Sequence, residues 1–183
     1  LPKQVEDIII PGQGEGIKLM SIAHYRKVNE ALVVRAPIAC KIVSEFLELV
    51  DWGDLDYLLI DFPPGTGDIQ LTLSQKSQMA GVIMITTPQE VATLDVQKAI
   101  HMFNVVNVPI LGIVENMSYY HNGSENVYIF GKGGGERLAK ENALQFLGQI
   151  PIDPTLSKNA DLGLAPQTLE PFHEIARKFQ LNY

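Results

Sequence analysis

The sequence predicts an α/β fold in which a doubly wound, mostly parallel sheet carries helices on both faces. Three apolar runs, at residues 55–60, 82–86 and 110–114, are too continuous for half-exposed strands and are typical of buried parallel ones. Stretches of helical length separate these runs. Pro37 and Pro88 stand where two of the helices begin, a position at which the missing N–H of proline does no harm. Strands and helices are therefore expected to alternate along the chain.

The elements predicted for the first half are, in order, strands at 17–22 and 31–34, a helix at 37–50, the buried strand at 55–60 and a helix at 69–79. The helix at 37–50 ends before Asp51-Trp52-Gly53. A Pro/Gly loop precedes the helix at 69–79. We expect Asp68 and Gln70 to cap that helix, with a water-holding role as the alternative.

The elements predicted for the second half are the strand at 82–86, a helix at 88–104, the strand at 110–114, a helix at 134–142, a strand at 146–150 and a helix at 171–179. The last helix follows from the spacing of its apolar residues, Phe172, Ile175, Ala176 and Phe179. Residues 128–130 are too few to assign.

Composition limits the classes of partner. A length of 183 residues suits one domain, and 46% hydrophobic content is ample for its core. The net charge of −7, without clustered Lys or Arg, excludes a nucleic-acid surface. No apolar run reaches the roughly 18 residues of a membrane span. Cys40 is the single cysteine, which fits a reducing compartment, the cytoplasm or an organellar stroma or matrix.

Asp61 ends the buried strand at 55–60 and opens the loop Phe-Pro-Pro-Gly-Thr-Gly that precedes Asp68. Open α/β sheets bind their ligands at this end of their strands. Nucleotide hydrolases place there a carboxylate for hydrated Mg²⁺ and a mobile loop that senses the terminal phosphate. Gly65 and Gly67 can present bare backbone N–H groups to such an anion. The alternative is an ordinary strand-to-helix turn with a capping aspartate.

Asn116 follows the strand at 110–114, at a second point on the same sheet edge. A side-chain amide both donates to and accepts from an adenine edge, so Asn116 is a candidate base reader, with a turn-forming role as the alternative. The loop Phe130-Gly-Lys-Gly-Gly-Gly-Glu136 has the layout of a phosphate cradle but lacks a lysine followed by Ser or Thr. We interpret this loop as a structural turn.

Five longer stretches carry a family resemblance: DWGDLDYLLIDFPPGTGDIQLTL (51–73), ITTPQEVATLDVQKAIHMF (85–103), VPILGIVENMS (108–118), FGKGGGERLAKE (130–141) and LGQIPIDPTL (147–156). They resemble the Mrp-type branch of the MinD/ParA-like P-loop ATPases, which are iron–sulfur cluster carriers and assembly factors. The resemblance implies ATP or ADP as ligand. It implies that Asp61 holds Mg²⁺ through water, that Gly65 and Gly67 sense the γ-phosphate, that Asn116 reads adenine and that the backbone at Pro151 closes over the base. A rigid proline-containing turn is the alternative at Pro151.

The chain departs from that family in two ways. Its pattern normally begins with a P-loop containing two lysines, whereas no GxxxxGK[ST] occurs here and Leu1-Pro2-Lys3 resembles the tail of the following switch segment. We therefore expect residues 1–183 to be the C-terminal portion of a single MinD/ParA-like nucleotide-binding domain, preceded by on the order of a hundred residues that carry the P-loop. Many members also have C-x-x-C after the ENMS segment. Residues 119–128 contain no cysteine, so no iron–sulfur ligand is assigned.

The resemblance implies an ATP-binding protein of iron–sulfur cluster assembly or transfer, a nucleotide-switched homodimer whose partners are iron–sulfur recipient or scaffold proteins. The complete protein is expected to be a weak ATPase, and residues 1–183 alone to be inactive. A MinD/ParA-like switch or scaffold without cluster chemistry is the alternative, which the missing C-x-x-C favours. A nucleotide-free domain with only a binding role is a third.

Overall fold

The structure is a computed structural model that describes residues 2–25, 36–166 and 169–180. The chain divides into two compact units, Leu1–Gln78 and Met79–Tyr183, and each is considered by itself. The strand predicted at residues 31–34 lies outside the described residues.

The second unit contains the predicted parallel sheet, with strands in the order β5 (Val82–Thr86), β6 (Ile110–Glu115) and β9 (Phe146–Gln149). Both strand pairs are parallel, because helices make the connections. The runs at 82–86 and 110–114 form strands as predicted. β6 is buried along most of its length, but in β5 Ile83 and Ile85 are 38% and 53% exposed, so the expectation that the run at 82–86 is buried on both faces is wrong. Ile113 of the central strand β6 and Leu147 of its neighbour β9 are fully buried.

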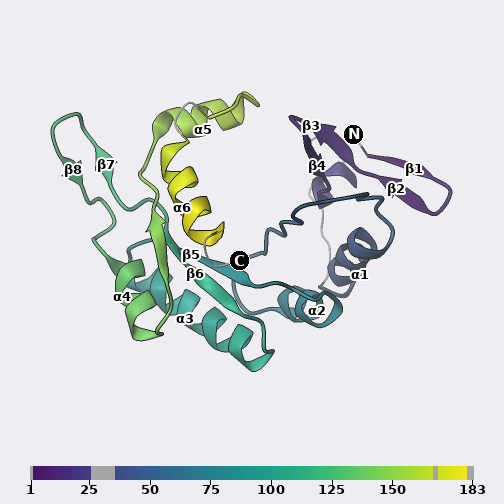
Figure 1. The fold of residues 1–183 in the computed structure, drawn as a ribbon, viewed down its shortest axis with the longest axis horizontal. Coiled ribbons are helices and arrows are strands. Elements are labelled where there is room, and N and C mark those ends of the chain that lie inside the picture. The colour runs from purple at the N-terminus through teal and green to yellow at the C-terminus, as the bar shows by residue number, and fades with distance from the viewer. Residues whose placement is uncertain (1, 26–35, 167–168, 181–183) are drawn as a thin grey trace. The chain divides into compact units, whose positions relative to one another are not determined.

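Helices lie on both faces of this sheet, as predicted for the fold class (Figure 1). α3 (Glu90–Val105) and α4 (Gly134–Glu141) cover one face, and α6 (Glu170–Gln180) covers the other. Gly148 allows the close approach of α6, because a Cβ at that position would lie 2.9 Å from Ile175 Cγ1. α5 (Pro154–Asp161) was not predicted from the sequence.

The first unit packs α1 (Ala36–Glu48) against α2 (Asp68–Lys76), which confirms the two helices predicted there. Ahead of them lie two antiparallel hairpins that were not predicted: β1 (Lys3–Val5) with β2 (Ile8–Ile10), and β3 (Gly12–Gly14) with β4 (Ile17–Leu19). The strand expected at 17–22 is therefore shorter, and a 3₁₀ turn (η1, Ile22–Tyr25) follows it.

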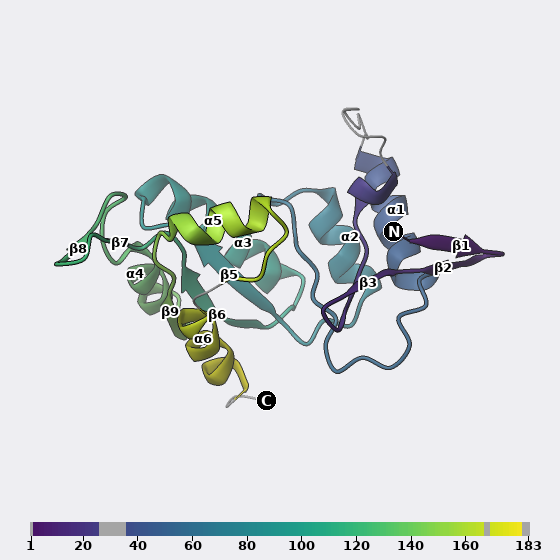
Figure 2. The ribbon, with the colours of Figure 1, turned by 90° about the horizontal axis from the view of Figure 1, so that it is seen from above.

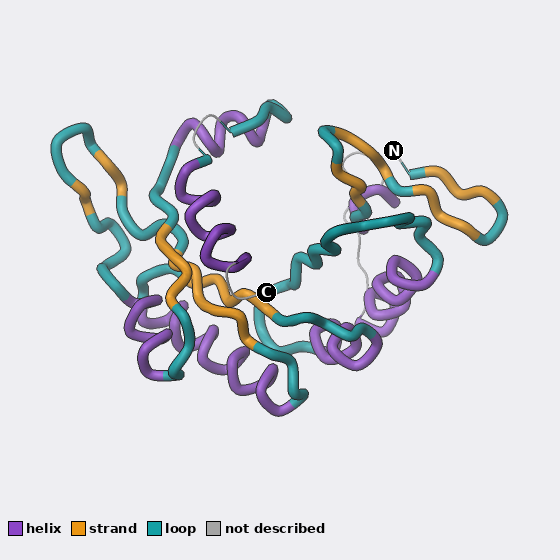
Figure 3. Tube along the Cα trace, viewed as in Figure 1, coloured by secondary structure: helices purple, strands orange, loops and turns teal. Residues whose placement is uncertain are grey.

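The prediction of a buried strand at residues 55–60 is wrong. The chain between α1 and α2 runs as loop (Figure 3), and Leu59 is 88% exposed. A parallel strand needs a neighbouring strand to satisfy its backbone N–H and C=O groups. Within the described residues no strand pairs with this segment, and β5 has β6 as its strand neighbour. An apolar run shows that a segment suits burial, but it does not supply the partner.

Candidate functional site

Asp61, Gly65 and Gly67 lie in the first unit, on the loop that leads into α2. The Asp61 side chain is exposed, and the loop has no regular secondary structure. Gly65 has a φ of 93°, a left-handed conformation that favours glycine. Gly67 is the residue that precedes the first turn of α2. The predicted phosphate-sensing residues are thus exposed next to a helix N-terminus, where backbone N–H groups are available to an anion.

Gln70 holds this loop in place. Its side chain is only 2% exposed, and its amide Nε2 donates to the carbonyl oxygens of Pro63 (2.7 Å) and Gly65 (3.1 Å). The expectation that Asp68 and Gln70 cap α2 is wrong, because α2 has no side-chain cap and Asp68 is its first helical residue. Gln70 instead turns back from the first turn of the helix, because the loop carbonyls need a donor.

The side chains available as metal ligands can be compared with those that Mg²⁺ prefers. Among residues 2–25, 36–166 and 169–180, no three His, Cys, Asp or Glu side chains form a group that could hold a metal ion. Asp61 would therefore supply one carboxylate. That donor set fits Mg²⁺, which usually keeps several waters and binds through one or two carboxylates together with substrate phosphates.

Asn116 lies in the second unit, directly after β6 at the carboxyl edge of the sheet. Its backbone N–H donates to the Thr86 carbonyl oxygen over 2.7 Å, which joins the ends of β6 and β5. Its side-chain Oδ1 accepts from the Met117 N–H over 2.9 Å, and Met117 has a φ of 54°. Within the described residues the Asn116 Nδ2 has no hydrogen-bond partner, so this group can donate to a ligand.

Pro151 runs beside Asn116, so the structure brings these two predicted residues together. Ile150 N–H donates to the Glu115 carbonyl oxygen (2.9 Å), and Ser118 N–H donates to the Ile150 carbonyl oxygen (3.0 Å). A hollow next to Pro151 has a volume of about 20 Å³ and is lined by Ile150, Pro151, Asp153, Leu156, Pro171 and Phe172. It holds about one water molecule. An adenine at Pro151 would therefore lie on this surface and not inside a cavity.

Asp153, two residues after Pro151, caps α5. Its Oδ1 accepts from the Thr155 Oγ1 (2.7 Å) and from the Thr155 N–H (2.8 Å). The hydroxyl of Thr155, followed by its backbone N–H, holds the pKa of the Asp153 carboxyl below its ordinary value of 3.8. The cap fixes the direction in which the chain leaves Pro151.

We predict that a carboxyl titration followed by NMR gives Asp153 a midpoint below 3.8 and that Thr155→Val raises this midpoint. Because the folded-state pKa is lowered, the cap stabilises the fold above the unfolded-state pKa. Its contribution is lost as the pH falls through the folded-state pKa. An unchanged midpoint in Thr155→Val would contradict the assignment of the hydroxyl as the main cause.

The glycines of the loop at 130–136 serve the packing of the second unit, as expected of a structural turn. A Cβ on Gly134 would lie 2.3 Å from the Pro88 carbonyl oxygen, so only glycine fits this contact. The Gly135 N–H at the start of α4 donates to the Glu115 carboxylate over 2.7 Å. This N–H is therefore occupied by a side chain of the same unit.

A hairpin lies within residues 119–128, the segment that follows Ser118 and contains no cysteine. β7 (Tyr120–His121) pairs with β8 (Asn126–Val127), and Figure 2 shows this hairpin projecting from the sheet. His121 Nδ1 lies 2.9 Å from Asn126 Oδ1 across the pair. At the base of the hairpin, Lys132 Nζ lies 4.7 Å from the centre of the Tyr128 ring. Hydrogen bonds and ring contacts, without thiolates, thus hold this segment.

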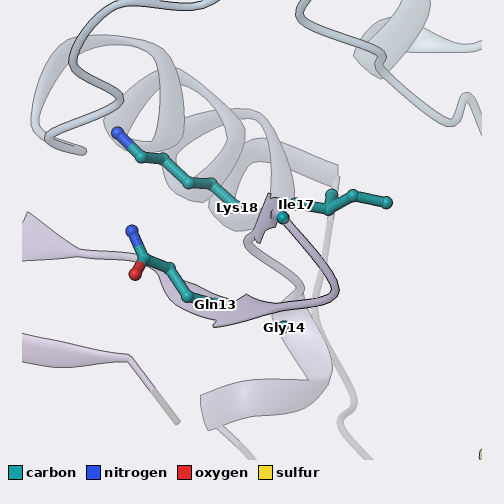
Figure 4. Close-up of a pocket in the computed structure, with 5 residues that line it drawn as sticks. Gln13, Gly14, Ile17 and Lys18 are labelled. Atoms are coloured by element: carbon teal, nitrogen blue, oxygen red, sulfur yellow. The ribbon is translucent and has the colours of Figure 1, made fainter.

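A separate hollow of about 340 Å³ lies on the β3–β4 hairpin of the first unit, lined by Gln13, Gly14, Gly16, Ile17 and Lys18. Gln13 and Lys18 form a cross-strand pair and extend to the same side of the hairpin, whereas Ile17 points away (Figure 4). Lys18 Nζ donates to the Trp52 carbonyl oxygen. None of the predicted site residues lines this hollow.

The family model and similar curated relatives indicate the same family. The family model described as ParA, NUBPL iron-transfer P-loop NTPase, matches residues 1–181. An iron–sulfur cluster carrier protein of Aquifex aeolicus is 41% identical over 93% of this chain and 48% of its own length. A mitochondrial iron–sulfur protein required for NADH dehydrogenase, from Arabidopsis thaliana, is 37% identical over 94% of the chain and 56% of its own length. The chain thus spans about half the length of these curated relatives.

Two solved structures share the fold. A nucleotide-binding protein from Archaeoglobus fulgidus, solved in complex with ADP, has a TM-score of 0.72 and 39% identity, and the match covers 88% of this chain and 64% of that one. The cell division ATPase MinD of Pyrococcus furiosus has a TM-score of 0.57 at 19% identity, covering 80% of this chain and 59% of its own, and supports the fold alone. Across the described ranges, no helix has the length and apolar character needed to cross a bilayer. The chain belongs to the ParA-type family of NUBPL iron-transfer P-loop NTPases.

Proposed function

We propose that this chain belongs to an ATP-binding protein that serves iron–sulfur cluster assembly or transfer as a nucleotide-switched homodimer. The observation that carries the proposal is the match of nearly the whole chain, at 41% identity, to an iron–sulfur cluster carrier protein. Its partners would be iron–sulfur recipient or scaffold proteins. Names of relatives include a chloroplastic assembly factor and a mitochondrial protein, so the proposed location is the cytoplasm or an organellar stroma or matrix.

In this proposal each site residue has a separate role. Asp61 would hold Mg²⁺ through water, and Gly65 and Gly67 would respond to the γ-phosphate. Asn116 would read the adenine edge with its free Nδ2, and the backbone at Pro151 would cover the base. Mg²⁺ would supply charge stabilisation for hydrolysis. The two units would then act as parts of one nucleotide-binding domain, since the family model spans residues 1–181.

Asn116→Ala in the full-length natural protein tests the proposed binding of ATP. Loss of a base hydrogen bond in a partly desolvated site is expected to weaken ATP binding about tenfold. Asn104→Ala is the matched control, because Asn104 has an exposed side chain on α3. Calorimetric titration with Mg-ATP measures both variants. Equal affinity in Asn116→Ala and wild type would contradict the assigned role of Asn116.

The number of cysteines limits whether residues 1–183 can hold a cluster, and Cys40 is the single cysteine of this chain. A cluster shared by two subunits needs two thiolates from each, and this chain has one cysteine. Cys40 lies half-buried in α1, with its Sγ 3.4 Å from the Thr72 hydroxyl of α2. The cluster is the protein's cargo in this proposal, so other cysteines must come from a partner or from elsewhere in the natural protein.

We predict that anaerobic reconstitution of residues 1–183 leaves far less than one cluster per dimer and that Cys40→Ser changes nothing. Iron and sulfide analysis gives the amount. A brown, oxygen-sensitive protein that loses its colour in Cys40→Ser would contradict this prediction. The same analysis on the full-length protein separates the carrier from the alternative, a MinD/ParA-like switch or scaffold, which the absence of C-x-x-C favours.

A further inference from the structure

Glu115 is a fully buried charged residue at the end of β6, and its side chain joins three elements. Its Oε2 accepts from the Gly135 N–H of α4 over 2.7 Å, and its Oε1 accepts from the Gln149 Nε2 of β9 over 3.1 Å. Its backbone carbonyl oxygen accepts from the N–H of Ile150 and from the hydroxyl of Ser118, both over 2.9 Å. Every polar group of this residue that faces the interior is thereby satisfied by a neighbouring element.

The geometry explains why a carboxylate can be buried at this point. The N-terminus of α4 carries a partial positive charge, which stabilises an anion that accepts from its first N–H groups. Gly135 makes the approach possible, because a Cβ there would lie 3.0 Å from the Glu115 Cβ and 3.3 Å from Oε2. The Glu115 carboxylate thus occupies the anion position that the Gly-rich loop would otherwise offer to a ligand.

The two residues proposed to contact adenine are adjacent in the chain to Glu115 or to one of its hydrogen-bond partners. Asn116 directly follows Glu115, and Pro151 directly follows Ile150, whose N–H bonds to Glu115. Gln149, which bonds to the Glu115 carboxylate, precedes Ile150. The separation of Asn116 and Pro151 therefore depends on bonds that Glu115 makes through its side chain and its backbone.

We propose that Glu115 is a positioning residue that sets the selectivity of the protein for adenine over guanine. The inference rests on the proposed binding of ATP by Asn116 and Pro151. Glu115 makes no contact with the nucleotide in this scheme. It holds the ends of β6 and β9 at one spacing, and a base reader works only when its donor and acceptor meet the edge of the base within a few tenths of an ångström.

Exchanging the carboxylate and the amide of the hydrogen-bonded pair provides the test. Gln149→Glu removes the amide donor and places a second carboxyl group beside the buried Glu115 carboxylate. Measurement at about pH 9 keeps the pair from sharing a proton, so that like-charge repulsion separates the two strand ends. The double variant Glu115→Gln/Gln149→Glu can rebuild every bond. The amide introduced at position 115 accepts from the Gly135 N–H with its oxygen and donates to the new carboxylate at position 149 with its nitrogen.

The readout is the ratio of the dissociation constants for GTP and ATP in the full-length natural protein, together with the Tm. Gln149→Glu is expected to lower this ratio at least about tenfold, and the double variant to restore it to within about threefold of wild type. Ile100→Val is the control for general destabilisation, because Ile100 is 2% exposed in α3. It is expected to lower the Tm and leave the ratio unchanged.

A ratio that stays at the wild-type value in Gln149→Glu while the Tm falls would overturn the inference, as would a folded double variant that fails to restore it. If Gln149→Glu does not fold, Glu115→Asp decides instead. It keeps the charge but is one methylene too short to reach both donors, so the ratio should fall, and an unchanged ratio overturns the inference. Wild-type protein that does not bind ATP would instead overturn the proposed function itself.

Discussion

Asp61→Asn in the full-length protein is expected to lower the turnover number for ATP hydrolysis about a hundredfold and to change the affinity for ATP far less. The proposed reason is that Asp61 holds Mg²⁺ through water. The charge stabilisation that Mg²⁺ would supply acts in the transition state, so loss of the Asp61 carboxylate is expected to fall on turnover. Steady-state hydrolysis and calorimetric titration of the same preparation measure the two quantities.

Asp56→Asn is the matched control for this prediction. Asp56 is also exposed and lies on the same loop between α1 and α2, five positions before Asp61. It is expected to retain wild-type turnover. Equal losses of turnover and affinity in Asp61→Asn would show that Asp61 has a structural role only.

Gln70→Met is expected to lower the free energy of unfolding by about 1–2 kcal/mol. Methionine keeps the length of the side chain but removes the amide that donates to Pro63 and Gly65. The loop loses its anchor to α2, so hydrogen exchange at Gly65 and Thr66 is expected to accelerate. Urea denaturation and amide exchange followed by NMR measure both effects.

Gln75→Met on the same helix provides the comparison, because the Gln75 side chain is exposed. It is expected to leave stability and loop exchange unchanged. If Gln70→Met and Gln75→Met behave alike, the buried amide of Gln70 does not hold the loop.

The helices and the parallel strands of the second unit could be predicted because local pattern and tertiary role agree there. β5 runs from Val82 to Thr86, as its apolar run indicates, because it pairs with β6, although its residues Ile83 and Ile85 are exposed. The hairpins of the first unit were missed for a local reason. Their turns contain Glu6, Glu15 and Gly16 with positive φ values of 54°, 50° and 76°. Glutamate is not a residue that usually signals such a turn.

The candidate site was predictable where a polar residue ends an apolar strand, as Asn116 does. Glu115 was missed because a buried carboxylate depends on its partners, and Gly135 and Gln149 lie 20 and 34 residues away in the chain. The role of Gln70 was predicted wrongly for a similar reason. Its amide reaches carbonyls of a loop whose path the sequence does not specify. The strand at 55–60 failed because an apolar run does not determine which backbone pairs with it.

Delivery of a cluster to an acceptor distinguishes a carrier from a nucleotide switch. The test mixes the full-length protein with Mg-ATP, iron, sulfide and the apo form of a [4Fe–4S] enzyme under anaerobic conditions, and follows the activity of that enzyme. We predict that the protein accelerates activation in an ATP-dependent way and that Asp61→Asn abolishes the acceleration. Activation at the same rate with and without the protein, while the protein hydrolyses ATP normally, would contradict a role in cluster transfer and favour the switch.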